Sequence, residues 1–293
     1  MIKKAVIPAA GFGTRFLPAT KAQAKEMLTV VDKPTIQYVI EEAVEAGIEQ
    51  ILIVTGKNKQ SIENHFDRSF EIETELLKKG KTAVYDEMVK ISNMAEIFYV
   101  RQKELNGLGD AIRYAKHFVN DEPFVVLLGD TIVSGKKCCT KELIETYEKY
   151  YKAVIGVEEV KKENVHLYGI IDGDKVEDNI YKINSLVEKP SVEEAPSNLA
   201  IAGRYLLTPN IFEYLEKIKP GKNGEYQLTD ALKLLCDDKG LIAKKYNGKR
   251  YDIGNKLGYL ITTIELAVKR KDLGDDFKNY LKDFVKNIDN IDI

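Results

Sequence analysis

Short runs of consecutive apolar residues, each followed by a glycine or a polar turn, dominate the first half of the chain. They lie at residues 5–7, 51–54, 97–100 and 124–128. Runs that are apolar on both faces are typical of strands buried in a parallel sheet. Residues 34–46 place apolar side chains at helical spacing, begin with a proline and are followed by a glycine. The order strand, helix, strand predicts a parallel sheet.

The pattern departs from this alternation in two places. Residues 57–93 are charged and have helical spacing, which predicts a helical excursion beside the sheet. After a helix expected at 142–151, strand-like segments are separated by turns and not by helices, which predicts a mixed-strand extension that carries a second ligand. These segments are 153–157, 169–172, 181–187 and 200–207.

The last part of the chain is predicted to be mainly helical. We expect helices at 228–235 and 257–269, a short segment at 251–254 and fraying at 287–293. The charged faces at 269–286 and, earlier in the chain, at 71–81 are expected to be solvated helix surface. The fold class is therefore predicted to be α/β, with a Rossmann-like, mostly parallel central sheet, helices on both of its faces, a mixed-strand portion and C-terminal helices. We expect residues 1–256 to form one domain, and residues 257–293 a helical segment.

Composition narrows the class of protein. The 293 residues include 44 Lys and Arg against 46 Asp and Glu, so no general charge favours nucleic acid and any anion site must be local. The 3 cysteines form neither a disulfide framework nor a zinc spacing, which fits a reducing, cytoplasmic location. We expect no signal peptide, and no run approaches the roughly 18 apolar residues of a membrane span.

A glycine loop follows the first predicted strand. In Gly11-Phe12-Gly13-Thr14-Arg15, two glycines let backbone N–H groups approach a ligand, and such a turn suits phosphate oxygens. Arg15 adds a planar fork of donors and Lys25 a mobile charge. The stretch predicts a polyphosphate site at the carboxyl end of a strand, although a loop of this kind can also serve only as a turn.

Two better-known phosphate-binding loops are excluded. The dinucleotide fingerprint requires a third glycine where this chain has Phe16, and an acidic residue after the second strand, which here ends in Thr55 and Gly56. The Walker loop requires Gly-Lys followed by Ser or Thr, and this triplet occurs nowhere in the chain.

Two aspartates are candidate metal ligands. Asp130 follows the strand at 124–128, where a carboxylate can hold Mg²⁺ or cap the next element. Asp252, taken alone, is more typical of a turn residue than of a ligand. The histidines share no catalytic spacing, and we expect His65, His117 and His166 to be structural or exposed.

Polar residues at other strand ends are candidates for binding a sugar phosphate or a base. Lys189, at the end of a strand and before a proline, can reach a monophosphate, and Glu188 can accept from sugar hydroxyls; the alternative is surface charge. Gly203 lies inside a strand, which indicates close backbone approach. Gln102 offers a donor and an acceptor that match a base edge as well as a satisfied loop amide.

Motifs along nearly the whole chain resemble those of the bacterial UTP–glucose-1-phosphate uridylyltransferases, a group of the sugar nucleotidyltransferases. They occur in family order at residues 6–21, 25–28, 32–34, 100–102, 107–109, 187–190, 195–200, 224–230 and 252–258. The sequence departs from the family at Ala24 and Thr29, where proline is usual on either side of Lys-Glu-Met-Leu. These changes remove stiffness near Lys25 but no functional group, so they concern affinity more than activity.

The resemblance implies an activity, a cofactor and an assembly. A phosphate oxygen of glucose 1-phosphate would attack the α-phosphorus of UTP in line, with Mg²⁺ as cofactor, giving UDP-glucose and pyrophosphate. No covalent enzyme intermediate and no general base are needed. Residues 1–256 would be the nucleotidyltransferase catalytic domain, and 257–293 would serve oligomerisation in a homodimer or homotetramer, with neither nucleic acid nor membrane as a partner.

The resemblance also assigns roles to residues. The catalytic residues would be Arg15, Lys25, Asp130, Lys189 and Asp252, with Asp130 and Asp252 sharing Mg²⁺. The nucleotide would be bound by Ala10, Gly11, Gly13, Thr14, Arg15, Lys25, Gln102 and Gly107. The sugar phosphate would be bound by Gly169, Glu188, Lys189 and Gly203. We expect the amide of Gln102 to pair with one uracil carbonyl and the adjacent N–H together, and the backbone at 107–109 to take the other carbonyl.

Two alternatives remain open. A dTTP-using sugar-1-phosphate thymidylyltransferase shares the glycine loop and the Glu-Lys-Pro motif, although the form of residues 25–28 and the long excursion at 57–93 favour the uridylyl group. A non-catalytic regulator that binds sugar nucleotides should have lost an acidic or cationic residue, yet all five catalytic candidates are present.

Overall fold

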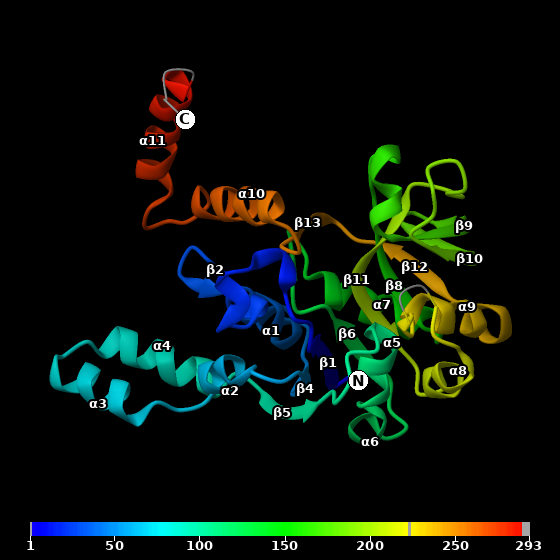
Figure 1. Cartoon of the computed structure of the whole chain (residues 1–293), viewed down its shortest axis with the longest axis horizontal. Coiled ribbons are helices and arrows are strands. Elements are labelled where there is room, and N and C mark those ends of the chain that lie inside the picture. Colours follow the sequence, from blue (N-terminus) through cyan, green and yellow to red (C-terminus); the bar gives the residue numbers. More distant parts are fainter. Residues whose placement is uncertain (1, 222–223, 289–293) are drawn as a thin grey trace.

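A nine-stranded sheet runs through the middle of the computed structural model, which describes residues 2–221 and 224–288 (Figure 1). One half of the sheet is built from the predicted apolar runs, and these strands pair in parallel in the order β5-β4-β1-β6. They are β1 (Lys4–Ala9), β4 (Gln50–Thr55), β5 (Glu96–Arg101) and β6 (Phe124–Leu127). The prediction of four strands here is confirmed.

The other half of the sheet is mostly antiparallel. Its strands are β8 (Val154–Glu159), β9 (Gly169–Glu177), β10 (Ile180–Glu188), β11 (Leu199–Leu207) and β12 (Ile242–Lys245). β11 pairs antiparallel with both β6 and β8, and β9 and β10 form a hairpin, whereas β12 runs parallel to β8. The sheet thus combines parallel and antiparallel pairs, so as a whole it is mixed and not mostly parallel. The α/β class is confirmed.

Helices cover both faces of the sheet, because successive strand residues point to opposite sides. Val6 and Leu52 belong to one apolar core, and Ile7 and Ile51 belong to the other. The first core is covered by α5 (Leu108–Arg113), α6 (Lys116–Val119), α8 (Ile211–Lys217) and α9 (Leu228–Lys239). The second is covered by α1 (Thr35–Glu45), α2 (Gln60–Phe66) and α7 (Cys139–Tyr150).

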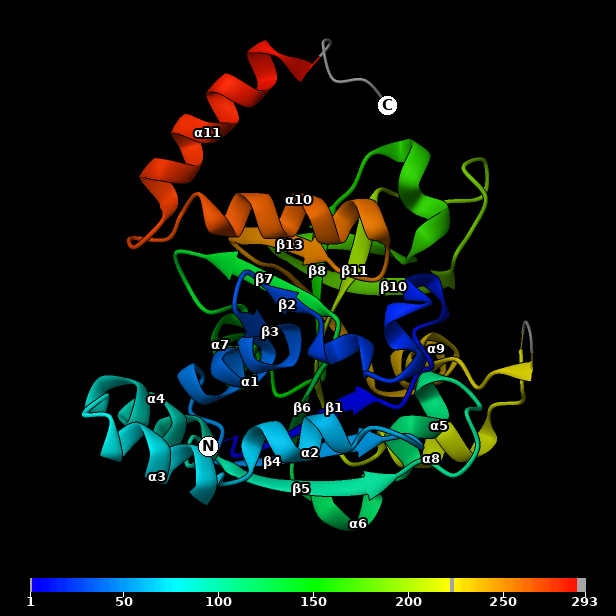
Figure 2. The same cartoon turned by 60° about the vertical axis from the view of Figure 1, so that its left-hand side comes forward.

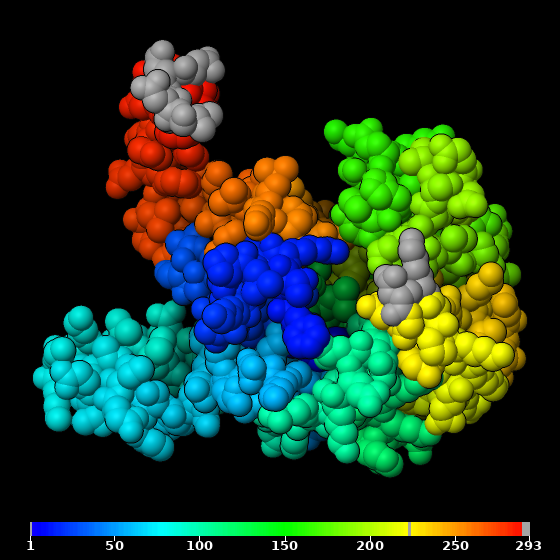
Figure 3. Space-filling model, in the orientation of Figure 1, coloured from blue at the N-terminus to red at the C-terminus, as the bar shows by residue number. Residues whose placement is uncertain are grey.

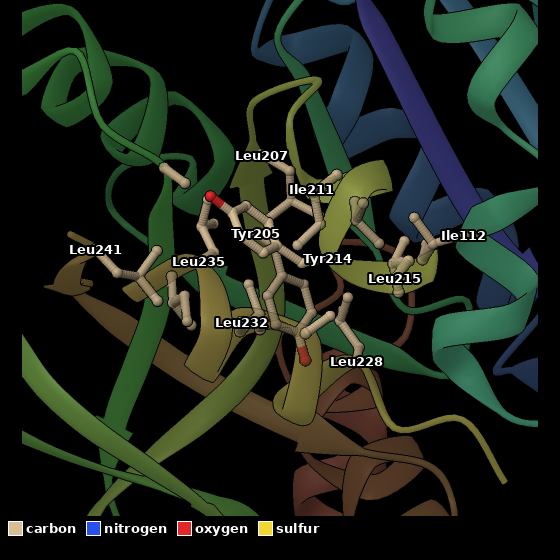
Figure 4. Close-up of a cluster of buried hydrophobic side chains, with 14 of the residues drawn as sticks. Ile112, Tyr205, Leu207, Ile211, Tyr214, Leu215, Leu228, Leu232, Leu235 and Leu241 are labelled. Atoms are coloured by element: carbon tan, nitrogen blue, oxygen red, sulfur yellow. The ribbon is translucent and has the colours of Figure 1, made fainter. Parts of the chain in front are cut away.

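A cluster of buried apolar side chains lies between the mixed half of the sheet and helices α8 and α9. Figure 4 shows Tyr205 of β11, Tyr214 of α8 and Leu232 of α9 side by side. This packing holds α9 against the sheet and therefore positions the polar residues of its first turn.

The predicted excursion is a set of helices that extends away from the sheet edge (Figure 1). It consists of α2, α3 (Phe70–Lys78) and α4 (Thr82–Ser92). One detail differs from the expected solvated surface at 71–81, because Glu73 is buried beneath its ion pair with Arg68.

The C-terminal part begins with a strand pair that the sequence did not predict. β13 (Gly248–Asp252) pairs antiparallel with β7 (Thr131–Gly135), and α10 (Lys256–Ala267) lies along this pair (Figure 2). α11 (Gly274–Lys286) projects away from the rest of the molecule (Figure 1). Of the end expected to fray at 287–293, residues 289–293 lie outside the described residues. Within those, no helix is both long and apolar enough to cross a membrane.

Several short elements were also not predicted, because two- to seven-residue segments carry little periodicity. Besides α8 and β12, they are β2 (Thr29–Val30), β3 (Lys33–Pro34) and the 3-10 turns η1 (Thr14–Phe16), η2 (Ala19–Lys21), η3 (Lys25–Met27) and η4 (Lys162–Leu167).

Candidate functional site

The glycine loop lies at the carboxyl end of β1 and forms one wall of a cavity of about 470 Å³. Gly13 has φ 67°, and a Cβ there would lie 2.8 Å from Cβ of Lys25, so a side chain would be both strained and in contact. Lining residues that the sequence assigned to the nucleotide are Ala10, Gly11, Gly13, Thr14, Lys25, Gln102 and Gly107. The structure therefore brings together seven of these eight residues around one space.

Arg15, the eighth, lies at the boundary with a second cavity. Its Nη1 donates to the carbonyl oxygen of Gly254 at 3.2 Å, and its side chain lines a cavity of about 910 Å³ shared with Glu188 and Lys189. The guanidinium thus ties the glycine loop to the turn after β13. In this arrangement Arg15 lies closer to the second cavity than the sequence led us to expect.

Asp130 and Asp252 converge at the point where the cavities meet. Asp130 follows β6, Asp252 ends β13, and the pairing of β7 with β13 places Asp252 opposite Thr131. A Cβ on Gly254 would lie 2.9 Å from Oδ1 of Asp252 and 3.9 Å from Oδ2 of Asp130. The expectation that these two carboxylates lie together is met, and the strand pair that the sequence did not reveal is the cause.

The charges in this cluster are strongly coupled. Nζ of Lys25 lies 2.6 Å from Oδ2 of Asp130. Burial alone raises the pKa of the Asp130 carboxyl, but the charge and hydrogen bond of Lys25, with smaller contributions from a backbone N–H and Arg204, together outweigh burial and lower the pKa. Burial likewise lowers the pKa of Lys25, and Asp130 together with Glu26 outweighs burial and raises it. Both groups are therefore held in their charged forms.

A second acid–base pair lies behind Lys25. Nζ of Lys59 is 2.7 Å from Oε2 of the fully buried Glu26, whose Oε1 has no hydrogen-bond partner among the described residues. Burial raises the pKa of Glu26 in spite of Lys59 and Lys25. Glu26 lines only the nucleotide-side cavity, whereas Asp130 and Asp252 both line the smaller cavity of about 310 Å³ next to it.

The donor set at the meeting point fits a magnesium ion. Within residues 2–221 and 224–288 no three His, Cys, Asp or Glu side chains form a complete cage for a metal. Mg²⁺ does not require one, since it is usually held by one or two carboxylates and completes its shell with water and substrate phosphate oxygens. Asp130 and Asp252, next to a cavity walled by a phosphate-type glycine loop, match that preference.

The sugar side of the site is organised around Glu188 and Lys189 at the end of β10. Oγ1 of Thr229, in the first turn of α9, donates to Oε2 of Glu188 at 2.6 Å. Nζ of Lys189 lies 3.1 Å from Oε1 of the same carboxylate, and Lys189 adopts φ 45°. A residue other than glycine in this left-handed region is uncommon and is often found at functional sites.

The two glycines expected near the sugar have different surroundings. A Cβ on Gly169 would lie 3.2 Å from Oε2 of Glu188, so Gly169 leaves room for this carboxylate. Gly203 has φ 72°, and a Cβ there would lie 3.0 Å from Cδ1 of Leu128. Both glycines line a smaller cavity of about 310 Å³ that also contains Glu188 and Asp130.

Several residues at the site were not singled out from the sequence. Glu225 lines all three cavities, and Thr229 fixes Glu188. His166 is exposed, as expected, and lines the larger cavity. Burial, and secondarily Glu188, raises the pKa of Asp230, which faces the same cavity. In the sequence, the motif at 224–230 was the signal that could have identified Glu225, Thr229 and Asp230.

Arg204 supports the site from within the fold. The guanidinium is fully buried; its Nη2 donates to Oε2 of Glu42 at 2.8 Å and to the carbonyl oxygen of Thr131 at 2.7 Å. It therefore joins α1 and β11 to the residue that follows Asp130.

Figure 3 shows the surface opening of this site. A hollow lies between the N-terminal residues, in blue, and the green residues of the mixed half of the sheet with the yellow residues around α8 and α9. The nucleotide-side and sugar-side residues thus face each other across one opening.

Comparison with known proteins shows the family of the chain. Residues 4–267 match the model of the nucleotidyl transferase family. The chain is 53% identical to the UTP–glucose-1-phosphate uridylyltransferase of Bacillus subtilis, over 96% of each chain. A crystal structure of UDP-glucose pyrophosphorylase complexed with UDP-glucose has a TM-score of 0.86 and 46% identity, covering 92% of this chain and 100% of that one.

A second solved structure is the UTP-bound UGPase from Acinetobacter baumannii. It has a TM-score of 0.89 and 44% identity, and the match covers 96% of this chain and 99% of that one. The chain belongs to the nucleotidyl transferase family and, within it, to the group of the UTP–glucose-1-phosphate uridylyltransferases.

Proposed function

We propose that the protein transfers a uridylyl group from UTP to glucose 1-phosphate, forming UDP-glucose and pyrophosphate. The observation that carries the proposal is the meeting of two cavities at Asp130, Asp252 and Lys25. The relatives named for this activity, and the UTP and UDP-glucose named in the two solved structures, support it.

In this proposal the nucleotide lies in the cavity walled by the glycine loop. Backbone N–H groups at Gly11 and Gly13 and the ammonium of Lys25 bind its phosphates. Gln102 and Gly107 lie beside the base. Glucose 1-phosphate lies in the larger cavity, where Glu188 accepts from sugar hydroxyls and Lys189 binds the phosphate.

The chemistry is a single in-line displacement. A phosphate oxygen of the sugar phosphate forms a bond to the α-phosphorus, the bond from that phosphorus to the bridging oxygen breaks, and pyrophosphate leaves with the electron pair. The nucleophile is already anionic, so no general base is required, and positioning and charge stabilisation supply the catalysis. Lys189 orients the attacking phosphate, while Arg15 and the glycine loop steady the pyrophosphate.

We also propose that Asp130 and Asp252 hold Mg²⁺. Bound there, the ion would neutralise charge on the phosphate oxygens around the reacting phosphorus. The ammonium of Lys25 lies 2.6 Å from Oδ2 of Asp130, so it helps to keep this carboxylate ionised and able to bind the metal ion.

The architecture supports three further parts of the proposal. The parallel half of the sheet serves as a Rossmann-like nucleotide-binding half, within a catalytic domain at 1–256. Residues 257–293 serve oligomerisation in a homodimer or homotetramer, supported by exposed apolar side chains on α10 and α11 such as Leu260, Tyr280 and Val285. The cytoplasmic location remains a prediction.

One experiment tests the activity directly. Purified protein is incubated with Mg²⁺, each of UTP, dTTP, CTP and ATP, and each of several sugar 1-phosphates, and pyrophosphate release is measured. We expect the pair UTP and glucose 1-phosphate to give the highest kcat/KM. A preference for dTTP would favour the thymidylyl alternative, and nucleotide binding without pyrophosphate release from any pair would favour the regulator.

A further inference from the structure

The side chain of Gln102 is already engaged by the protein at its amide nitrogen. Gln102 follows β5, lines the nucleotide-side cavity and is only 4% exposed. Its Nε2 donates to Oδ2 of Asp110 at 2.7 Å and to the carbonyl oxygen of Gly107 at 3.3 Å. Asp110 lies in the first turn of α5, which starts directly after Gly107.

This arrangement leaves the carbonyl oxygen as the free group of Gln102. A side-chain amide has two N–H donors on its nitrogen and an acceptor oxygen, whereas a carboxylate and a backbone carbonyl only accept. Both acceptors face Nε2, so Oε1 points to the side that they do not occupy. The expectation that this amide pairs with a carbonyl and an N–H of uracil together is therefore corrected, because its donors are already used.

A lone acceptor at this position distinguishes the pyrimidine bases. Uracil and thymine carry N–H at N3, which donates to Oε1, whereas N3 of cytosine is a bare acceptor. Cytosine would place two acceptors face to face, and such a mismatch of buried polar groups is worth several orders of magnitude in kcat/KM. Rotation of the amide by half a turn would present Nε2 and accept cytosine, but it would also place Oε1 against the carboxylate of Asp110.

Resting on the proposed function, we propose that Asp110 is a positioning residue for base specificity: it holds the amide of Gln102 in the orientation that accepts uracil and rejects cytosine. Asp110 acts through Gln102 and does not itself touch the base.

The carboxylate of Asp110 is itself held in place. Nη1 of Arg113 lies 3.8 Å from its Oδ1, and Nε of Arg113 donates to the carbonyl oxygen of Leu215 at 3.1 Å. The same guanidinium lies 4.0 Å above the ring of Tyr226. Gly109 donates to Tyr226 O at 2.8 Å, so the segment before α9 closes over the start of α5.

A plainer reading is that Asp110 only places a negative charge in the first turn of a helix, where it is favourable. The two readings predict different kinetics. Loss of a structural charge lowers kcat/KM for UTP and CTP alike, whereas loss of amide orientation changes their ratio. The ratio of the two kcat/KM values is therefore the decisive quantity.

The test compares wild-type protein with Asp110→Asn and Asp110→Glu. Asparagine has the same shape but offers a donor that satisfies the rotated amide, so we expect the UTP-to-CTP ratio of kcat/KM to fall by about tenfold or more. Glutamate keeps an acceptor, and we expect it to keep most of the preference. KM for glucose 1-phosphate should not change in either variant.

The matched control is Glu104→Gln, which removes a carboxylate from the same loop. Glu104 accepts from Nδ2 of Asn106 at 3.2 Å and makes no hydrogen bond to Gln102. We expect this variant to keep the wild-type ratio. Calorimetric titration with UDP and with CDP, in the absence of sugar phosphate, measures the same preference without turnover.

The outcomes separate the inference from the proposed function. If wild-type protein forms no UDP-glucose, the proposed function fails. If it does so and Asp110→Asn keeps the wild-type ratio, or loses activity with UTP and CTP equally, the positioning role of Asp110 is overturned. A lower ratio in both kinetics and titration, with the Glu104→Gln control unchanged, supports it.

Discussion

Nζ of Lys25 lies 2.6 Å from Oδ2 of Asp130, so a cation of the nucleotide side directly contacts a carboxylate of the proposed metal site. The two residues are far apart in the sequence and come from η3 and from the turn after β6. Each is the main group that opposes the effect of burial on the other's pKa, so the contact helps to keep both charged. Substitution of Lys25 should therefore change the pKa of Asp130.

The first prediction concerns the pH dependence of Lys25→Met. In the wild-type protein the pKa of Asp130 is lowered, so its carboxylate stays ionised as the pH falls below neutrality. Without the ammonium, the remaining effect of burial raises the pKa of Asp130, so this carboxylate becomes protonated at a higher pH. We expect the acidic limb of the pH profile of kcat/KM to move to higher pH. This shift is separate from any decrease of kcat/KM at the optimum pH.

Profiles of UDP-glucose formation between about pH 5 and 9, a window that lies between the ordinary pKa values of carboxyl groups and of lysine amines, measure this shift. Lys21→Met, at an exposed lysine of η2, is the control and should keep the wild-type profile. An acidic limb that stays in place in Lys25→Met would show that Asp130 does not limit activity.

The second prediction concerns the metal. Asp252→Asn removes one of two carboxylates that face the same point, so we expect a higher Mg²⁺ concentration for half-maximal activity and roughly a hundredfold lower kcat, the usual cost of losing a charge-stabilising group. Chelation with EDTA should abolish activity, and added Mg²⁺ should restore it. Asp275→Asn on α11, far from the site, is the control. An unchanged Mg²⁺ dependence in Asp252→Asn would rule out this residue as a ligand.

The third prediction concerns Lys189. Its ammonium lines both sugar-side cavities, and we expect Lys189→Ala to lower turnover roughly a hundredfold at saturating glucose 1-phosphate. Lys175→Ala, on the exposed end of β9, is the matched control and should keep normal turnover. Near-normal turnover of Lys189→Ala would mean that this lysine is surface charge only.

The fourth prediction concerns stability. Arg204 and Glu42 form a buried ion pair, and removal of one partner leaves the other charge unpaired. We expect Arg204→Met to lower the free energy of unfolding by about 3–5 kcal/mol, measured in urea. Arg204→Met combined with Glu42→Met should lose clearly less than the two single variants together, since no charge then remains unpaired. Additive losses would show that the pair does not couple.

The elements predicted correctly are those whose side chains follow a clear period. The run at 124–128 is apolar on both faces and α10 has helical spacing, so each could be read without knowledge of its neighbours. β7 and β13 could not be read in this way. Each is a five-residue strand, and they pair with each other from distant parts of the chain, so no local pattern shows that they belong together.

The same distinction applies to the site. Gly13, Lys25 and Gln102 stand directly after strands or in a recognisable loop, and the structure brings them to one cavity. Asp110 and Thr229 form hydrogen bonds to other side chains of the protein, so their roles do not follow from residue type, and only Thr229 lies in a recognised motif, at 224–230. Only the three-dimensional contacts show which group each of them orients.

Thr229 provides the last prediction. Its hydroxyl donates to Oε2 of Glu188 at 2.6 Å, and Lys189 lies at the other oxygen, so both oxygens of this carboxylate are fixed. Thr229→Val keeps the shape but removes the hydroxyl, and a hydrogen bond to a charged group is worth about 1.5–3 kcal/mol.

We expect kcat/KM for glucose 1-phosphate to fall by about tenfold to a hundredfold in Thr229→Val, because Glu188 is no longer aligned with the sugar hydroxyls. KM for UTP should stay the same, since the proposed nucleotide site is the other cavity. Thr229→Ser retains the hydroxyl and should recover most of the loss. Steady-state kinetics with each substrate varied in turn separates these effects, and equal losses for UTP and glucose 1-phosphate would show that Thr229 supports α9 as a whole and not Glu188.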